Sequence, residues 1–252
     1  NKNNDNYVAW AWNAGSSTAT NTDGSISSQV RASQTAGFSI CTYTGNGQAN
    51  QTIGHGLNSK PSLVIIKSRD QQRNWVVIPT FINDKYFFYL NDTSALLTQL
   101  GTYYGTHTSS VVGITGDSSG SNSNANGEDY LCYAFAPVAG YSAFGSYTGS
   151  GNNSGSFIFT GFAVRFLLIK CTSDSGQEWV IIDTARSPVN VADEALYAND
   201  SAAEDTNSSR DVDLLSNGFK LRNGSSGATD FSGRTYIYAA FASHPFQAAR
   251  AR

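Results

Sequence analysis

Residues 129–136 read Asp-Tyr-Leu-Cys-Tyr-Ala-Phe-Ala, and residues 235–242 read Thr-Tyr-Ile-Tyr-Ala-Ala-Phe-Ala. Upstream of each segment the same residue types recur in the same order, at a spacing of 103 to 108 residues: Tyr43 with Tyr147, Lys67 with Lys170, Trp75 with Trp179, and Asn91 with Asn199. A spacing that drifts so little indicates two copies of one structural unit. We therefore expect the two copies to superpose strand for strand.

The closing segment occurs a third time near the start of the chain. Residues 6–13 read Asn-Tyr-Val-Ala-Trp-Ala-Trp-Asn, with almost nothing in front of them. A strand without partners cannot bury its apolar face. The pattern therefore predicts that residues 1–15 form the last strand of a truncated upstream unit. Its sheet partners, which must cover Trp10 and Trp12, would come from another chain or from residues absent here.

Composition limits the class of protein. The chain of 252 residues has 14% charged residues and a formal net charge of −3, so its polar surface is built mainly from Ser, Thr, Asn and Gly. Such a surface lacks the basic field that binding to phosphates requires, and we expect no nucleic-acid partner. No apolar run approaches the length of a membrane span, and we expect no membrane partner.

The secondary-structure signal is almost wholly β. Runs rich in Val, Ile, Phe, Tyr and Thr alternate with clusters of Gly, Asn, Ser and Asp, which is the pattern of short strands joined by turns. We predict an all-β fold of two tandem jelly-roll-like β-sandwich units. The predicted parts are the upstream strand (1–15), a linker or arm (16–37), the first unit (38–139) and the second unit with a short tail (140–252).

Several predicted strands are apolar on both faces. Residues 63–66 read Leu-Val-Ile-Ile, and residues 180–182 read Val-Ile-Ile. Such strands lie at the centre of a two-sheet sandwich, or in a sheet whose outer face meets another unit. Because a single sandwich cannot always cover both faces, we expect the chain to associate with itself, most readily as a trimer, or to tile against a neighbour.

The repeated pattern resembles a known family. Each unit contains Tyr-Thr-Gly, an Ile-Lys strand, Trp-Val-Ile or Trp-Val-Val, and Asn-Asp-Ser or Asn-Asp-Thr, and the second adds Ser-Asn-Gly-Phe-Lys-Leu at 216–221. This is similar to the tandem β-domains of virion structural and tail-fibre-like proteins of marine tailed phages, cyanophages among them. The resemblance covers essentially the whole chain and implies an extracellular protein of the virion exterior, with other virion proteins as partners. It transfers no functional residue.

No catalytic or cofactor motif is visible. The carboxylates that could form a glycosidase pair are Asp183 and the loop residues Glu204 and Asp205, but Pro79 stands at the position of Asp183 in the first unit. The three cysteines lack the spacing of a zinc site, and Cys41 with Cys132 is the one disulfide worth considering. We therefore expect no enzyme activity, no catalytic residue, no cofactor and no metal.

One loop remains a calcium candidate. Residues 117–129 place carboxylate and amide oxygens close together, as a hard cation requires, although the loop lacks the spacing of an EF-hand. The residues concerned are Asp117, Asn122, Asn124, Asn126, Glu128 and Asp129. A flexible Ser/Asn/Gly turn is the alternative interpretation.

A second loop is the candidate for ligand binding. Tyr103, Tyr104 and His107 lie in a Gly-flanked stretch, where aromatic rings could stack on a sugar or prop the loop against the sandwich. The sequence favours a non-enzymatic virion structural protein, a tail fibre or a surface decoration, with host attachment as a further role. A carbohydrate-binding module or adhesin for a cell-surface glycan is the alternative, and a polysaccharide depolymerase is a distant third.

Overall fold

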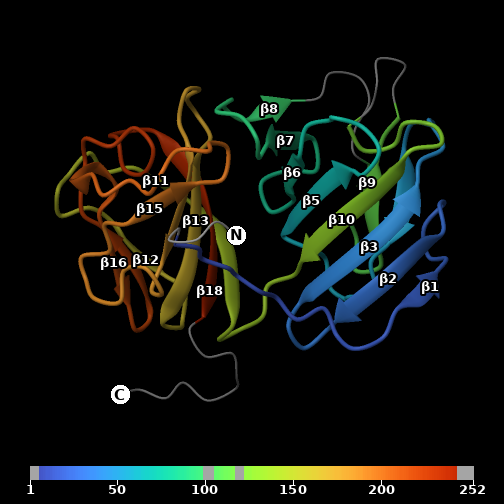
Figure 1. Cartoon of the computed structure of the whole chain (residues 1–252), viewed down its shortest axis with the longest axis horizontal. Helices are drawn as coiled ribbons and strands as arrows, with labels where there is room; N and C mark the ends of the chain where they lie inside the picture. Colours follow the sequence, from blue (N-terminus) through green and yellow to red (C-terminus); the bar gives the residue numbers. More distant parts are fainter. Residues whose placement is uncertain (1–5, 99–104, 117–121, 243–252) are drawn as a thin grey trace.

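The computed structural model describes residues 6–98, 105–116 and 122–242. They form two all-β units that lie side by side (Figure 1). The described part of the chain holds no helix with the length and apolar character needed to cross a lipid bilayer. Its one helical element is the 3-10 turn Ser208–Arg210.

Each unit has one large antiparallel sheet and one small sheet that face each other across a core. The large sheet of the first unit contains, in spatial order, β1 (Ala19–Asn21), β2 (Ser28–Ser33), β3 (Phe38–Thr44), β10 (Asp129–Phe135), β5 (Leu63–Ser68), β6 (Val76–Pro79), β7 (Tyr86–Tyr89) and β8 (Leu97–Thr98). Its small sheet pairs β4 (Gln51–Gly54) with β9 (Val111–Ile114).

The second unit repeats this plan. Its large sheet has the order β11 (Ser142–Thr148), β18 (Thr235–Ala242), β13 (Val164–Cys171), β14 (Trp179–Asp183) and β15 (Ala195–Tyr197). Its small sheet has the order β12 (Phe157–Phe159), β17 (Gly218–Leu221) and β16 (Val212–Leu215). The run 212–221, which reads as one strand, is therefore a hairpin of two.

Five central strands of the two large sheets correspond in order. The order β3-β10-β5-β6-β7 corresponds to β11-β18-β13-β14-β15. The register is also the same, because Lys67 lies opposite Leu131 in the first unit and Lys170 lies opposite Ile237 in the second. The prediction of two tandem β-sandwich units is confirmed.

Two tyrosines form a repeated brace inside each sandwich. Tyr43 stacks on Tyr130 with ring centroids 5.3 Å apart, and Tyr147 stacks on Tyr236 at 5.0 Å. In each pair one hydroxyl accepts a backbone N–H of the loop that precedes the closing strand. Burial raises the pKa of Tyr130 to about 12, so the phenol stays protonated. The tyrosine of each Tyr-Thr-Gly motif therefore has a structural role, because it packs against the tyrosine of the closing strand.

A shared apolar layer joins the two units. We call this layer the seam; it consists of the outward faces of the two large sheets, which pack on each other. Its buried members are Ala14, Phe38, Leu63, Val77, Phe88 and Phe135 with Phe166, Leu168, Trp179, Ile181, Ile237, Ala239 and Phe241. The strands that are apolar on both faces therefore contribute one face to their own sandwich and the other to the seam. The cover that seemed to require another chain comes from the same chain.

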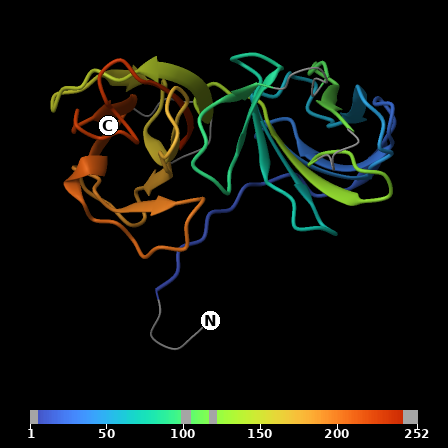
Figure 2. The same cartoon turned by 90° about the horizontal axis from the view of Figure 1, so that it is seen from above.

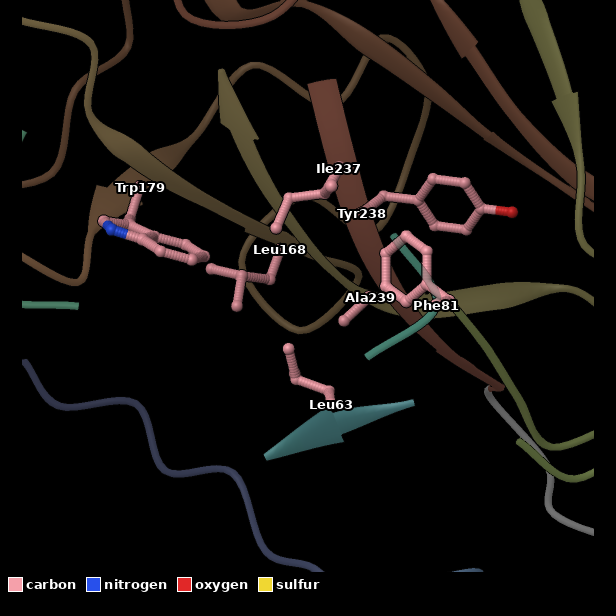
Figure 3. Close-up of a pocket in the computed structure, with 7 residues that line it drawn as sticks. All are labelled: Leu63, Phe81, Leu168, Trp179, Ile237, Tyr238 and Ala239. Carbon is pink, nitrogen blue, oxygen red and sulfur yellow. The ribbon is translucent and has the colours of Figure 1, made fainter. Parts of the chain in front are cut away.

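The seam is closely packed. Leu63 of the first unit faces Leu168 and Ile237 of the second (Figure 3). The indole of Trp179 donates to the carbonyl oxygen of Tyr89 at 2.9 Å. The cavity between these side chains measures about 10 Å³. That volume is at the lower limit for one water molecule, so this cavity is not a ligand site.

The strand predicted at residues 1–15 does not form over the described residues 6–15, and residues 1–5 lie outside the described part of the chain. The described residues 6–15 pair with no described strand, and they cross from one unit to the other as an extended segment (Figures 1 and 2). Trp12 contacts Phe241 and Phe166 edge to face, and Trp10 contacts Phe166 at a centroid distance of 5.5 Å. Both indoles are half-buried against the seam, so they find apolar cover on their own chain.

The assignment of residues 16–37 as a linker or arm is also wrong in part. β2 pairs antiparallel with β3 and carries β1 on its other side, so the segment extends the large sheet of the first unit. Ser28 and Val30 face inward and are buried, while Gln29 and Arg31 face solvent. A strand whose second face is exposed to solvent needs apolar residues on one face only, which explains why a stretch so poor in apolar residues is a strand.

Cys41 and Cys132 are direct neighbours across β3 and β10. Both thiols are free and fully buried, and Cys171 is free as well. The hydrogen bond with the Cys41 sulfur, together with burial, raises the pKa of Cys132, which keeps this thiol protonated.

Candidate functional site

A groove lined by polar residues lies at the rim of the first unit and has a volume of about 610 Å³. We call it the rim groove. It is formed by the start of β4 and the turn before it, the loop between β4 and β5, the turn after β6, and the loop that leads to β9. Its lining residues are Asn50, Thr52, Lys60, Thr80, Asn83, Asp84, Lys85, Gly105 and Thr106. None of them is apolar or aromatic, so the groove presents hydroxyl, amide, ammonium and carboxylate groups.

One ion pair crosses the wall of the rim groove. Lys60 Nζ lies 3.1 Å from Asp84 Oδ1, and both side chains are partly exposed, at 45% and 29%. An exposed pair of this kind contributes little to stability, of the order of 0.5 kcal/mol. Because this pair costs little free energy to open and is partly exposed, the ammonium of Lys60 and the carboxylate of Asp84 can bind a ligand instead.

Backbone geometry shapes the wall opposite this pair. Asn50 and Gly105 both adopt positive φ, at 53° and 75°. A Cβ at Gly105 would lie 3.1 Å from the Cα of Gly113, so glycine lets the loop lie flat on β9.

Of the predicted sugar-binding residues, His107 is placed in the fold. It lies beneath the rim groove, 2% exposed, and its Nδ1 accepts the backbone N–H of Gly113 at 3.3 Å. Its Nε2 is buried without a hydrogen-bond partner among the described residues. The prediction of a surface contact at His107 is therefore wrong, because the ring props the loop from below. Tyr103 and Tyr104 lie outside the described residues.

Burial keeps His107 neutral. It lowers the pKa of His107 to about 4; the carboxylate of Asp84 opposes this shift, and Lys60 and His55 reinforce it. The pKa of His55 is also lowered by burial, and its Nδ1 accepts the N–H of Leu57. Both histidines are therefore neutral, and each accepts a backbone N–H through its Nδ1.

This burial predicts a pH-dependent stability. Between pH 6.5 and about 4, His107 is protonated in the unfolded chain but stays neutral in the folded chain. The free energy of unfolding therefore falls as the pH drops through that window. The loss should reach at most about 3 kcal/mol. His107→Asn keeps an acceptor for Gly113 and cannot titrate, so its urea midpoint should depend less on pH over the same window. Parallel pH profiles for the variant and the wild type would refute this assignment.

The calcium candidate loop is held by the protein's own donors. Asn122 Oδ1 accepts the N–H of Asn74, Asn124 Oδ1 accepts the N–H of Asn46, and Asp129 Oδ1 accepts the hydroxyl of Thr44. Glu128 pairs with Arg73, whose guanidinium holds the pKa of this carboxyl below its usual range. Asn126 is exposed, and Asp117 lies outside the described residues. Among the described residues, no three His, Cys, Asp or Glu side chains converge on a metal site.

Asp183 is engaged in a buried ion pair and is 1% exposed. Its Oδ2 lies 2.8 Å from Arg186 Nε and also accepts the indole N–H of Trp10 at 3.2 Å. Its Oδ1 accepts the backbone N–H groups of residues 185 and 186. Glu204 binds the other side of the same guanidinium. These two carboxylates hold one arginine and do not flank an open cleft.

Lys170 is the second unit's most strongly perturbed lysine. Burial lowers its pKa to about 8, and its Nζ donates to the carbonyl of Gln177. Lys67 makes the equivalent contact with the carbonyl of Arg73. Because both units use the lysine to close the loop before the Trp strand, we assign Lys170 a structural role.

Sequence reasoning pointed to the loop beside the rim groove but missed the groove itself. β4 was not predicted, because Gln-Thr-Ile-Gly offers one strongly apolar residue. The signal that could have found the groove is the cluster Asn83, Asp84 and Lys85 between two strands, a polar turn in a chain with few charges.

Comparison with known proteins yields one family match. A family model described as a domain of unknown function, DUF7483, matches residues 1–245. No curated protein and no solved structure matches the chain.

Proposed function

We propose a function for this chain, which belongs to the family of DUF7483 domains: it is a non-enzymatic structural module of the exterior of a tailed-phage particle, and its rim groove holds a glycan during attachment. The family description assigns no role. The virion part of the proposal rests on the resemblance of the repeated sequence pattern to phage structural proteins. The glycan part rests on the rim groove.

The observation that carries the glycan proposal is the lining of the rim groove. A sugar presents hydroxyl groups that donate and accept at once, and the groove supplies Thr hydroxyls, Asn amides, the Asp84 carboxylate and two ammonium groups. Its volume of about 610 Å³ lies within the range of small-ligand sites. The second unit lacks the Lys60 and Asp84 pair in its aligned sequence, so the site belongs to the first unit.

Other features support a structural role over a catalytic one. The carboxylates that seemed most suitable for hydrolysis, Asp183 and Glu204, are bound to Arg186. The strongly perturbed side chains His107 and Lys170 make contacts inside the fold. The seam fuses two sandwiches into one body, which suits a module that must keep its shape on a particle surface.

A glycan array tests the ligand proposal. The wild-type chain should bind at least one class of surface polysaccharide, and the double variant Lys60→Ala/Asp84→Ala should bind it about tenfold more weakly, a loss of about 1.4 kcal/mol. The matched control is Asp174→Ala/Lys220→Ala, which removes one anion and one cation from the second unit and should bind as the wild type does. Absence of binding by the wild type, or equal losses in both variants, would contradict a glycan site in the rim groove.

The virion proposal needs a separate test. Antibodies raised against the chain should label intact particles of the phage that encodes it, and digestion of the particle surface should release its peptides for mass spectrometry. Peptides found only in infected-cell lysate and never in purified particles would contradict a place in the virion.

A further inference from the structure

The two units differ at one sheet edge. In the first unit, β3 is covered by β2, which pairs with it antiparallel from Gln29 opposite Thr42 to Ser33 opposite Phe38. The equivalent strand of the second unit is β11, which pairs with β18 on one side. Among the described strands none pairs with the other side of β11 (Figure 1). The second unit therefore ends at β11, whereas in the first unit the equivalent strand β3 is covered and the sheet ends at the three-residue strand β1.

The missing cover follows from the chain's connectivity. The first unit is preceded by the segment 16–37, which supplies β1 and β2, whereas only residues 136–141 connect β10 to β11. The same segment also covers the small sheet of the first unit, because Ile26 bridges to Ile53 and Ser28 Oγ donates to the carbonyl of Gly54. No such segment precedes the second unit within this sequence.

The side chains beside β11 differ from those beside β3, although no strand covers the outer edge of β11 among the described residues. Gly145 stands where the first unit has Cys41, and the ring of Tyr238 lies over it, so that a Cβ at Gly145 would approach Tyr238 within 2.9 Å. The ring of Tyr238 is partly buried and packs against the core of the second unit. On the small sheet, Phe157 and Phe159 occupy the positions of Thr52 and Gly54, and they are 47% and 67% exposed.

The open edge lacks the features that keep strands apart. Residues 142–148 read Ser-Ala-Phe-Gly-Ser-Tyr-Thr, without a charged residue or a proline. Natural edge strands that must stay single carry lysine, proline or a bulge, or they are very short. An uncharged edge of this length is a ready template for another strand, and two copies of it meet without repulsion.

We propose that β11 pairs with β11 of a second copy of this chain, antiparallel about a two-fold axis at Gly145. In that register Phe144 lies opposite Ser146 of the second copy, and Ala143 lies opposite Tyr147, so each large side chain meets a small one. The geometry is the one that β2 already adopts on β3. The two five-stranded sheets would become one continuous sheet. The symmetry is two-fold, in place of the trimer expected from the sequence, and the interface is isologous.

The test is mass as a function of concentration, by sedimentation or light scattering, from about 1 to about 100 μM, which spans weak to moderate affinities. The wild-type chain should approach twice its mass of 26.9 kDa. Ser146→Lys/Thr148→Lys places lysines at exposed positions of β11 and should remain at the mass of one chain. Amide exchange at residues 143–148 should slow with concentration in the wild type alone.

Two controls localise the contact. Thr20→Lys/Gln29→Lys adds the same charge to exposed positions of β1 and β2 and should associate as the wild type does. Phe157→Thr/Phe159→Gly installs the residues of the first unit on β12 and tests the small sheet separately. A wild type that stays at 26.9 kDa throughout, or a Ser146→Lys/Thr148→Lys variant that still dimerises, would overturn the proposal.

Discussion

Replacement of Phe241 by alanine is expected to lower the free energy of unfolding of the whole chain by about 3 to 5 kcal/mol. Phe241 lies at the centre of the seam and is 8% exposed. Its ring contacts Phe135 of the first unit at 5.7 Å, and Trp12 of the crossing segment at 5.4 Å. The truncation removes contacts to three parts of the molecule at once, so the cavity cannot be filled by the movement of one element.

Urea unfolding followed by fluorescence and by far-ultraviolet circular dichroism measures this effect. Phe159→Ala is the matched control, because this ring is 67% exposed and its loss should change stability by less than about 0.5 kcal/mol. If Phe241→Ala cost no more than the control, the seam would contribute nothing to stability.

Replacement of Asp183 by alanine should have an effect of the same size, about 3 to 5 kcal/mol. Among the described residues, the substitution leaves the guanidinium of Arg186, whose side chain is 10% exposed, with Glu204 and the carbonyl of Ile181 as its partners. It also removes the acceptor for the indole N–H of Trp10. Thermal or urea unfolding of the purified variant measures the loss.

The exposed pair of Lys60 and Asp84 provides the comparison for Asp183. Asp84→Ala breaks an ion pair in which both side chains are partly exposed, so its cost should stay below about 1 kcal/mol. A loss of binding without a loss of stability in Asp84→Ala, together with the reverse in Asp183→Ala, would separate the ligand site from the scaffold. Equal stability losses in the two variants would contradict the assignment of Asp183 to the scaffold.

The repeat made most of the fold predictable. Tyr43 with Tyr147 and Lys67 with Lys170 mark equivalent strands, and a period-two strand fixes which side chains share a face. The two-faced apolar strands correctly indicated a sheet whose outer face meets another unit, which was one of two open interpretations. Local sequence could not say that this unit belongs to the same chain, because strand patterns report burial and not its source.

The errors have a common physical cause. Residues 6–13 share the side-chain pattern of a closing strand, yet Trp10 and Trp12 pack their rings against the seam and the segment joins no described strand. Residues 28–33 have few apolar side chains, yet backbone pairing with β3 makes them a strand. In both places tertiary contacts outweigh local propensity.

The candidate site was predicted less well than the fold. His107 marked the right region, but its burial depends on how the loop lies on Gly113 and not on its own neighbours in sequence. The rim groove draws Lys60, Asp84 and Gly105 from three separate turns. Such a set becomes visible only when strand order places those turns at one end of the sandwich.

The central claim is that the seam makes the two repeats one cooperative structure. Differential scanning calorimetry of the full chain tests it most directly. A single transition whose calorimetric enthalpy equals its van't Hoff enthalpy is the predicted result, because neither unit can open without exposing the seam of the other. Two separate transitions, each with the enthalpy of about half the chain, would contradict it.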